Sequence, residues 1–357
     1  MKLNDVHAIW LTLNRACNLR CKWCYAQKSN FAEEQIMEIE LARLIIDTQS
    51  IMSVSPSYTL IGGEPLLYPD LEKLLIYMAY RNCKIGVMTN GIALADQDFC
   101  QRCITCSQGQ IRFNISLKGL SNEEYMRHCG KPVFDSVLQA IENVEKARLN
   151  ISCSYVISES NVKGLTEFVK RYCALGLGHI PLLFSHCADV VFEAPKPKTM
   201  TDIEVDRCFN SQYAEIHRIL EGNFALHQSL PLCVCDQAII NLMKSREQLF
   251  TSCHLLHESG LVFDTNGGIL FCNHLIGTAL GKYGVDYHDL ESLRAFFESD
   301  MIQECRRRLC TMPEEYCGFC SRANICGGGC ALRYFSKSLT DLRSELNEYS
   351  SKPGIEK

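Results

Sequence analysis

The sequence lacks the features of a membrane protein, a secreted protein or a nucleic-acid-binding protein. No apolar run in its 357 residues is long enough to span a bilayer. The N-terminal stretch MKLNDVHAIWLTL has no basic segment followed by an apolar stretch and a cleavage site, so we predict no signal peptide. The net charge is only −5, and no basic patch is interleaved with aromatic residues. We therefore expect a cytoplasmic protein with no membrane and no nucleic-acid partner.

Cysteine, in contrast, is abundant, with 22 residues in the chain. A cytosolic protein of this size does not keep so many cysteines as disulfides. The remaining interpretations are small buried side chains, metal ligands and redox thiols, and the spacing of the cysteines has to separate them.

Apolar runs and amphipathic stretches alternate through the first half of the chain. This alternation predicts a parallel sheet with helical crossovers. Six strand–helix units are too few for a closed eight-fold barrel, so the expected fold is α/β: a partial (β/α)6 TIM-like barrel, or otherwise a doubly wound sheet. The expected strands cover residues 6–13, 58–61, 84–88, 111–117, 150–157 and 179–184.

The chain divides into four expected parts. Residues 1–195 form the barrel, and residues 196–250 form a helical linker that begins near the APKPKT stretch. Residues 251–340 form a C-terminal cysteine-rich iron–sulfur domain, held by metal rather than by a core. The tail, residues 341–357, is polar.

The most informative motif is C-x3-C-x2-C, formed by Cys17, Cys21 and Cys24 directly after the first expected strand. The ends of barrel strands carry active sites. Three thiolates can hold a [4Fe–4S] cluster and leave one iron open for a substrate or cofactor. The alternative is a zinc site completed by a distant histidine.

With Trp23 and Tyr25 flanking its last cysteine, this motif resembles that of the radical S-adenosylmethionine (SAM) enzymes. The resemblance implies that the open iron binds the amino and carboxylate groups of SAM. A reduced flavodoxin- or ferredoxin-type protein would supply the electron that cleaves SAM to methionine and a 5′-deoxyadenosyl radical. That radical would abstract a hydrogen from the substrate.

Further motifs follow later strands in the order found in this family. In LIGGEP, the resemblance assigns Gly62, Gly63 and Glu64 to the SAM amino group, whereas a simple glycine turn is the alternative. Ser116 in NISLKG and Arg127 would bind the SAM carboxylate, although Arg127 can equally be a solvated helix residue. The family usually has an aspartate where this chain has Lys118. The resemblance also assigns Trp23, Tyr25 and Ala188 to the cofactor site.

A second group of cysteines resembles the SPASM extension of radical SAM enzymes, which holds two auxiliary [4Fe–4S] clusters. The spacings are C-x13-G-x4-C, followed by C-x2-C-x5-C-x3-C. The resemblance implies that Cys253, Cys272 and Cys330 hold the first auxiliary cluster. It assigns Cys317, Cys320 and Cys326 to the second, while a zinc knuckle is the alternative.

This extension lacks its usual last ligand, because no cysteine follows Cys330. We therefore expect one or two auxiliary clusters. Cys310 is the expected replacement for the missing ligand, with Cys305 as second choice. Cys235 or Cys233 could complete the first auxiliary cluster, or its fourth iron could stay open. Cys100, Cys103 and Cys106 could hold a further cluster, but we favour small core side chains.

The resemblance implies the cofactor chemistry more firmly than the substrate. SPASM enzymes mostly act on peptides or proteins, so maturation of a ribosomally synthesised peptide by crosslinking or oxidation is the expected function. Formylglycine formation in sulfatases ranks lower, because that branch has an aspartate base where this chain has Asn273, and an amide takes no proton at neutral pH. His274 is a candidate base, with a hairpin-surface histidine as the alternative.

Two other functions stay open: a radical SAM dehydrogenase of a small molecule, and a non-catalytic iron–sulfur or zinc protein. Only about five residues precede the first expected strand, so we expect no N-terminal leader-binding domain. A peptide precursor would then need a separate leader-peptide-binding protein.

Overall fold

The computed structural model describes the chain from residue 6 to residue 330, with gaps. The described ranges are 6–25, 35–51, 55–187, 199–227, 230–248, 260–276, 279–300, 302–303, 315–326 and 328–330. Among the helices in these ranges, none is long and apolar enough to cross a membrane.

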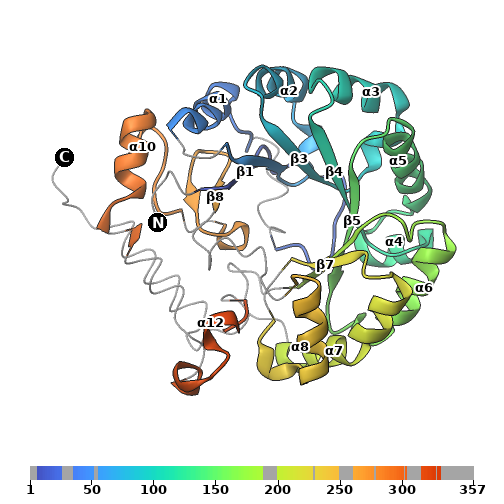
Figure 1. The fold of residues 1–357 in the computed structure, drawn as a ribbon. Helices are drawn as coiled ribbons and strands as arrows, with labels where there is room; N and C mark the ends of the chain where they lie inside the picture. Colours follow the sequence, from blue (N-terminus) through green and yellow to red (C-terminus); the bar gives the residue numbers. More distant parts are fainter. Residues whose placement is uncertain are drawn as a thin grey trace.

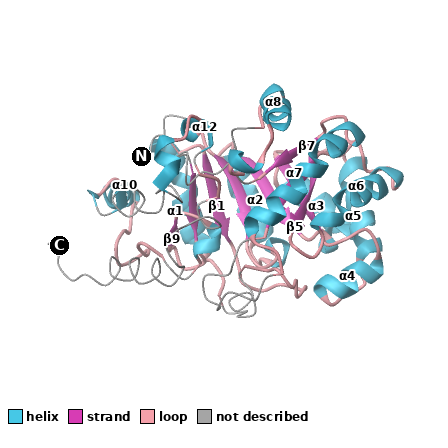
Figure 2. Ribbon diagram, turned by 90° about the horizontal axis from the view of Figure 1, so that it is seen from below, coloured by secondary structure: helices cyan, strands magenta, loops and turns pink. Residues whose placement is uncertain are grey.

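One nine-stranded sheet organises the fold, with strand order β7-β6-β5-β4-β3-β2-β1-β8-β9. All neighbouring strands are parallel except β8 and β9, which form an antiparallel hairpin. Figure 2 shows the strands side by side, with helices around them. The strands are β1 Ala8–Thr12, β2 Ser57–Ile61, β3 Lys84–Thr89, β4 Ile111–Leu117, β5 Ile151–Ile157, β6 Leu182–His186, β7 Phe224–Leu226, β8 Gly260–Phe263 and β9 Ile269–Leu270.

Helices cover the convex side of this curved sheet (Figure 1). Their apolar residues recur at helical spacing; in α5, for example, Val137, Ile141 and Val144 are buried. The helices are α1 Ile39–Asp47, α2 Leu71–Tyr80, α3 Gln97–Cys106, α4 Asn122–Cys129, α5 Phe134–Lys146, α6 Leu165–Ala174, α7 Asp202–Ile219, α8 Gln237–Ser245, α10 Leu290–Phe297 and α12 Ala323–Cys326.

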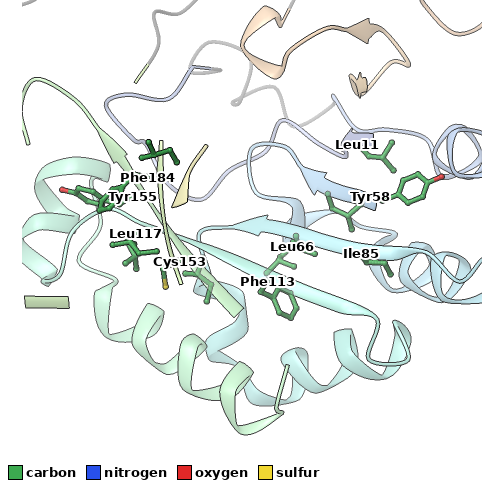
Figure 3. Packing of buried hydrophobic residues seen from close by; sticks show 14 of the residues in the cluster. Leu11, Tyr58, Leu66, Ile85, Phe113, Leu117, Cys153, Tyr155 and Phe184 are labelled. Atoms are coloured by element: carbon green, nitrogen blue, oxygen red, sulfur yellow. The ribbon is translucent and has the colours of Figure 1, made fainter. Parts of the chain in front are cut away.

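The core runs along the strands from one end of the sheet to the other (Figure 3). Alternate residues of neighbouring strands enter it, among them Leu11, Ile85 and Phe113, all of which are buried. Tyr58 also lies there, and its hydroxyl donates to Ile46 O of α1 at 2.9 Å. Cys153 is a fully buried member of the same core.

The expected α/β partial barrel is confirmed, because parallel strands alternate with helices as the sequence predicted. The three-residue strand β7 and the helices α4 and α10 were not predicted. Strands β8 and β9 form a hairpin, and β8 also pairs in parallel with β1. The division into domains at residues 195 and 250 stays a prediction, but the sheet continues beyond both positions.

The cysteines of α3, which we expected to be small core side chains, do lie in or against the core. Cys100 and Cys103 on α3 are buried, and Cys106 is half-buried against the same core. Burial raises the pKa of Cys103 to about 12, so its side chain is a neutral thiol.

Candidate active site

The three-cysteine loop (Asn14–Tyr25) follows β1 and lies at the carboxyl end of the parallel sheet. Its backbone is held on two sides. Gly63 N donates to Asn14 O at 3.0 Å, and Glu64 N donates to Ala16 O at 2.8 Å. At the other side, Arg20 N donates to Cys129 O at 3.1 Å and Lys22 N to His128 O at 3.0 Å. The loop is therefore fixed between the turn after β2 and the end of α4.

Gly62 and Gly63 are needed for this packing of one loop on another. A Cβ atom at Gly62 would lie 2.6 Å from Asn14 O. A Cβ atom at Gly63 would overlap the carbonyl oxygens of Ala16 and Arg15. The glycine pair thus lets the GGEP backbone approach the three-cysteine loop, whatever further contact it makes with a ligand.

The carboxylate of Glu64 is buried and ties its own turn after β2 to the turn after β3. Its oxygens accept hydrogen bonds from Thr89 Oγ1 at 2.6 Å, Asn90 N at 2.8 Å and Leu66 N at 3.2 Å. Burial raises the pKa of Glu64, and these donors oppose that shift. The TNG turn after β3 therefore has a defined role, which is to position Glu64 beside the three-cysteine loop.

The three thiols differ in their surroundings. Burial raises the pKa of Cys17 to about 11, and the charges of Glu64, Cys21 and Cys24 add to this. The pKa of Cys21 is lowered to about 6, mainly by a hydrogen bond with Cys129 and further by the charges of Lys118 and His128. Leu19 N also donates to Cys17 Sγ at 3.4 Å.

This donor set fits an iron–sulfur cluster. No three histidine, cysteine or acidic side chains within the described ranges converge as the ligands of a single metal ion do. A cubane cluster does not require such convergence, because each thiolate binds a different iron. Three thiols with backbone N–H donors and a nearby ammonium group suit an anionic cluster with one iron free of protein ligands.

Ser116 and Lys118 lie at the end of β4 close to this loop. The buried Lys118 donates from Nζ to Ser116 Oγ at 2.5 Å. The lysine that replaces the family's usual aspartate therefore orients the serine assigned to the SAM carboxylate. Arg127 is exposed on the last turn of α4, and Trp23 packs edge-on against His128, with ring centroids 5.2 Å apart.

The β8–β9 hairpin reaches the three-cysteine loop from the other end of the sequence. His274 stacks on Tyr25, with ring centroids 4.4 Å apart and an interplanar angle of 22°. The Tyr25 hydroxyl also hydrogen-bonds to the side chain of Asn273. On the opposite side of the hairpin, the buried Arg15 forms an ion pair with Asp264.

His274 is half-buried rather than fully exposed on the surface. Burial lowers its pKa to about 4, so the imidazole is neutral near pH 7 but is a weak base. Its Nδ1 atom is buried and has no hydrogen-bond partner in the described structure. Such an unpartnered polar atom beside the three-cysteine loop suits a ligand that would complete the site.

The structure describes the C-terminal cysteines in part. Cys272 ends the hairpin and lies near Tyr25, and Cys330 is buried. Cys317 and Cys320 lie before α12, where Cys320 N donates to Cys317 O at 3.2 Å, and Cys326 is the last residue of α12. Ala188, Cys253, Cys305 and Cys310 lie outside the described residues.

Comparison with known proteins now identifies the N-terminal part. Residues 11–170 match the Radical SAM superfamily. The chain contains a radical SAM domain. Proteins with this domain bind a [4Fe–4S] cluster and SAM, and the three thiols at the carboxyl end of β1 fit that requirement.

The curated relatives match about half of this chain. An Fe-coproporphyrin III synthase of Methanosarcina barkeri is 26% identical over 157 residues, which cover 44% of this chain and 38% of that protein. A probable GTP 3′,8-cyclase of Sulfolobus acidocaldarius is 28% identical over 205 residues, covering 56% of this chain and 63% of the cyclase. The match thus spans about two fifths to three fifths of these relatives.

Solved structures match over nearly the whole chain. Native anSMEcpe with bound AdoMet and the Cp18Cys peptide has a TM-score of 0.69 at 19% identity, covering 96% of both chains. Streptococcus suis SuiB bound to its precursor peptide SuiA has a TM-score of 0.69 at 17% identity, covering 95% of this chain and 76% of SuiB. At these identities the likeness concerns the fold.

Several residues of the site carry no signal in the sequence. Asp264 is a turn residue, and its partner Arg15 lies 249 positions away. Cys129 and His128 lie on α4, a polar helix without a clear apolar stripe. For Lys118, the departure from the family pattern was visible, but its contact with Ser116 was not.

Proposed function

We propose that this protein is a SAM-dependent radical enzyme that abstracts a hydrogen atom from a peptide substrate. Cys17, Cys21 and Cys24 would hold the SAM-binding [4Fe–4S] cluster. When bound and reduced, this cluster supplies the electron that cleaves SAM. The observation that carries the proposal is the fixed three-cysteine loop at the carboxyl end of β1. This loop packs against the glycine pair, and its Tyr25 stacks on His274, which follows the β8–β9 hairpin.

The remaining assignments of the SAM site follow from the same edge of the sheet. Gly62, Gly63 and Glu64 would face the SAM amino group, while Ser116 and Arg127 would bind its carboxylate. Lys118 supports this role of Ser116 because its ammonium group both orients the hydroxyl and adds positive charge. Trp23, Tyr25 and Ala188 remain the proposed neighbours of the adenosine.

A peptide substrate is favoured by the extent of the two kinds of similarity. The relatives named for small molecules match over 157 and 205 residues, which are 44% and 56% of this chain. The two solved structures that hold peptides match over 95–96% of this chain. The likeness to the peptide-bound folds is thus the more extensive of the two, and this supports a peptide substrate.

Within peptide chemistry, we rank maturation of a ribosomally synthesised peptide above formylglycine formation. Asn273 hydrogen-bonds to Tyr25 next to the three-cysteine loop, and its amide cannot act as a base. His274 is neutral but only weakly basic. Neither side chain therefore offers the strong base that the sulfatase-maturing branch has at this position.

The test is anaerobic incubation of the reconstituted protein with SAM and dithionite. We expect 5′-deoxyadenosine from the wild type and none from Cys24→Ala, measured by mass spectrometry. Absence of 5′-deoxyadenosine from an iron-loaded wild type would overturn the proposal in favour of a non-catalytic iron–sulfur protein.

The substrate class is tested with short precursor-like peptides, with GTP as the small-molecule comparison. A peptide product that has lost two hydrogen atoms and does not react with a hydrazide supports maturation. A product that reacts with a hydrazide would instead reveal the aldehyde of formylglycine. Stimulation of SAM cleavage by GTP alone would overturn the peptide assignment. A flavodoxin- or ferredoxin-type reductant and a leader-peptide-binding protein are the proposed partners.

A further inference from the structure

The neighbouring cysteines Cys233 and Cys235 have different surroundings. Both lie at the short turn Leu232–Val234 that precedes α8. Cys235 is buried, and its Sγ lies 3.2 Å from Asn210 Oδ1 of α7. Cys233 is exposed on the other side of the turn. Two cysteines one residue apart therefore have different partners.

The turn that carries Cys233 packs directly on the C-terminal cysteine segment (Cys317–Cys330). Leu232 N donates to Cys326 Sγ at 3.2 Å. Arg322 donates from Nη1 to Leu232 O at 3.1 Å and from Nη2 to Gln237 Oε1 at 3.0 Å. The turn before α8 and the segment around α12 are thus joined by three hydrogen bonds, and the two helices lie near each other in Figure 1.

Three cysteines of this segment lie in a short, tightly turned stretch. Cys320 N donates to Cys317 O at 3.2 Å, and Cys326 N donates to Arg322 O at 2.9 Å. Arg322 N donates to Cys320 Sγ at 3.4 Å. Two of the three sulfurs therefore accept backbone N–H hydrogen bonds, as cluster-bound thiolates commonly do.

Cys233 directly follows Leu232, the residue whose backbone N–H contacts Cys326 Sγ, so it lies on the turn that packs against the C-terminal cysteine segment. Electrostatic interactions of Cys233 with Cys326, Cys317 and Cys320 agree with this placement. Cys235 differs in its hydrogen-bond partner, because its Sγ donates to Asn210 Oδ1 of α7.

We propose that Cys233 is the fourth ligand of an iron–sulfur cluster held by Cys317, Cys320 and Cys326. The inference rests on the proposed iron–sulfur enzyme in one respect, because it requires that these three cysteines hold a cluster. Cys233 takes the role for which the spacing had suggested Cys310. On binding, the Cys233 thiol releases its proton and its sulfur bonds to iron. The cluster then links the turn before α8 to the C-terminal cysteine segment.

The test uses the full chain, reconstituted anaerobically, in the background Cys17→Ala/Cys21→Ala/Cys24→Ala. The iron that remains there belongs to the auxiliary sites. Adding Cys233→Ser is expected to remove about four irons and four sulfides per chain, or to change the EPR spectrum of the reduced cluster. Adding Cys235→Ser, the matched control two residues away, is expected to change neither quantity.

A second measurement needs no variant of Cys233. In the iron-loaded wild type, Cys233 is expected to resist alkylation by iodoacetamide although its residue is exposed. It is expected to react after iron is removed with a chelator. Peptide mapping by mass spectrometry reads both states, so the proposal stays testable even where Cys233→Ser fails to fold.

Four results would overturn the proposal: unchanged iron and EPR spectrum in Cys233→Ser, rapid alkylation of Cys233 in the loaded protein, loss of the same cluster in Cys310→Ser, or zinc in place of iron. Each is separate from the proposed function. That function is judged by 5′-deoxyadenosine formation at the intact three-cysteine loop, which requires no iron at Cys233.

Discussion

The Arg15–Asp264 ion pair makes the stability of the fold depend on one residue of the hairpin. Both residues are buried, and Arg15 lies two positions before Cys17, the first cysteine of the C-x3-C-x2-C motif. Burial lowers the pKa of Arg15, and the carboxylate of Asp264 opposes that shift. Since removing one partner leaves a buried charge uncompensated, we expect Asp264→Asn to lower the free energy of unfolding by about 3–5 kcal/mol.

Urea unfolding under anaerobic conditions measures this loss. The control is Glu142→Gln, which breaks the exposed pair between Glu142 and Lys146 and is expected to cost at most about 0.5 kcal/mol. The double variant Arg15→Met/Asp264→Leu should be more stable than Asp264→Asn. Equal losses in Asp264→Asn and Glu142→Gln would contradict a role for the buried pair.

The glycine pair gives a second residue-level prediction. Gly63→Ala would force its new Cβ into the carbonyl oxygens of Ala16 and Arg15. We expect the three-cysteine loop to shift, so that the protein loses about four irons per chain and most of its 5′-deoxyadenosine formation. Gly164→Ala is the matched control because nothing lies within 4 Å of its added Cβ. Full iron content in Gly63→Ala would show that the loop tolerates the extra atom.

The secondary-structure elements differ in how well the sequence predicts them. Strands such as β1 and β4 are apolar runs rich in branched side chains, which pattern alone predicts. The three-residue β7 is too short for any periodicity, and α4 is polar along most of its length. Yet α4 supplies the carbonyl groups of His128 and Cys129 that hold the three-cysteine loop. The missed element is thus one that positions the site through its backbone.

Helix α4 is itself held by Glu124, which leads to a pH-dependent prediction. Glu124 pairs with Arg171 of α6 at 2.6 Å and accepts a hydrogen bond from Leu120 N. Burial on its own would raise the pKa of Glu124, but these partners bring it below its ordinary value of 4.5. A carboxyl with a lowered folded-state pKa stabilises the fold above the unfolded pKa. That stabilisation is lost as the pH falls through the folded pKa.

We therefore expect Glu124→Gln to be less stable than the wild type by about 1 kcal/mol at pH 7. The difference in thermal midpoint between the two proteins should stay constant down to about pH 5.5 and shrink below about pH 4.5. Acid loss of iron affects both proteins, so only the difference is compared. A difference that shrinks already near pH 6.5 would indicate a histidine rather than Glu124.

For the molecule as a whole, the sequence predicted which residue types gather at the carboxyl ends of the strands, because motif order follows strand order in a parallel sheet. It could not predict contacts between distant segments. Whether Cys233 or Cys235 faces the C-terminal cysteines depends on one turn before α8. The stacking of Tyr25 on His274 likewise depends on where the hairpin joins the sheet. Such long-range placement is a property of the packed fold and not of local spacing.

The position of the β8–β9 hairpin also determines whether the barrel can fold without the C-terminal part of the chain. Strand β8 covers the edge of β1 with a four-residue parallel pairing, and Leu261, Val262 and Phe263 are buried there. A chain that ends at residue 250 would lose this burial, at about 1.5–3 kcal/mol for each side chain. It would also leave β1 as an unpaired edge and Arg15 without Asp264. We expect such a chain to aggregate or to lack a cooperative thermal transition in circular dichroism.

The control is a chain that ends at residue 340, which keeps every described residue and should have the same thermal transition as the full protein. A cooperative, monomeric 1–250 fragment would mean that β8 belongs to a separate domain, as the predicted boundary near residue 250 implies.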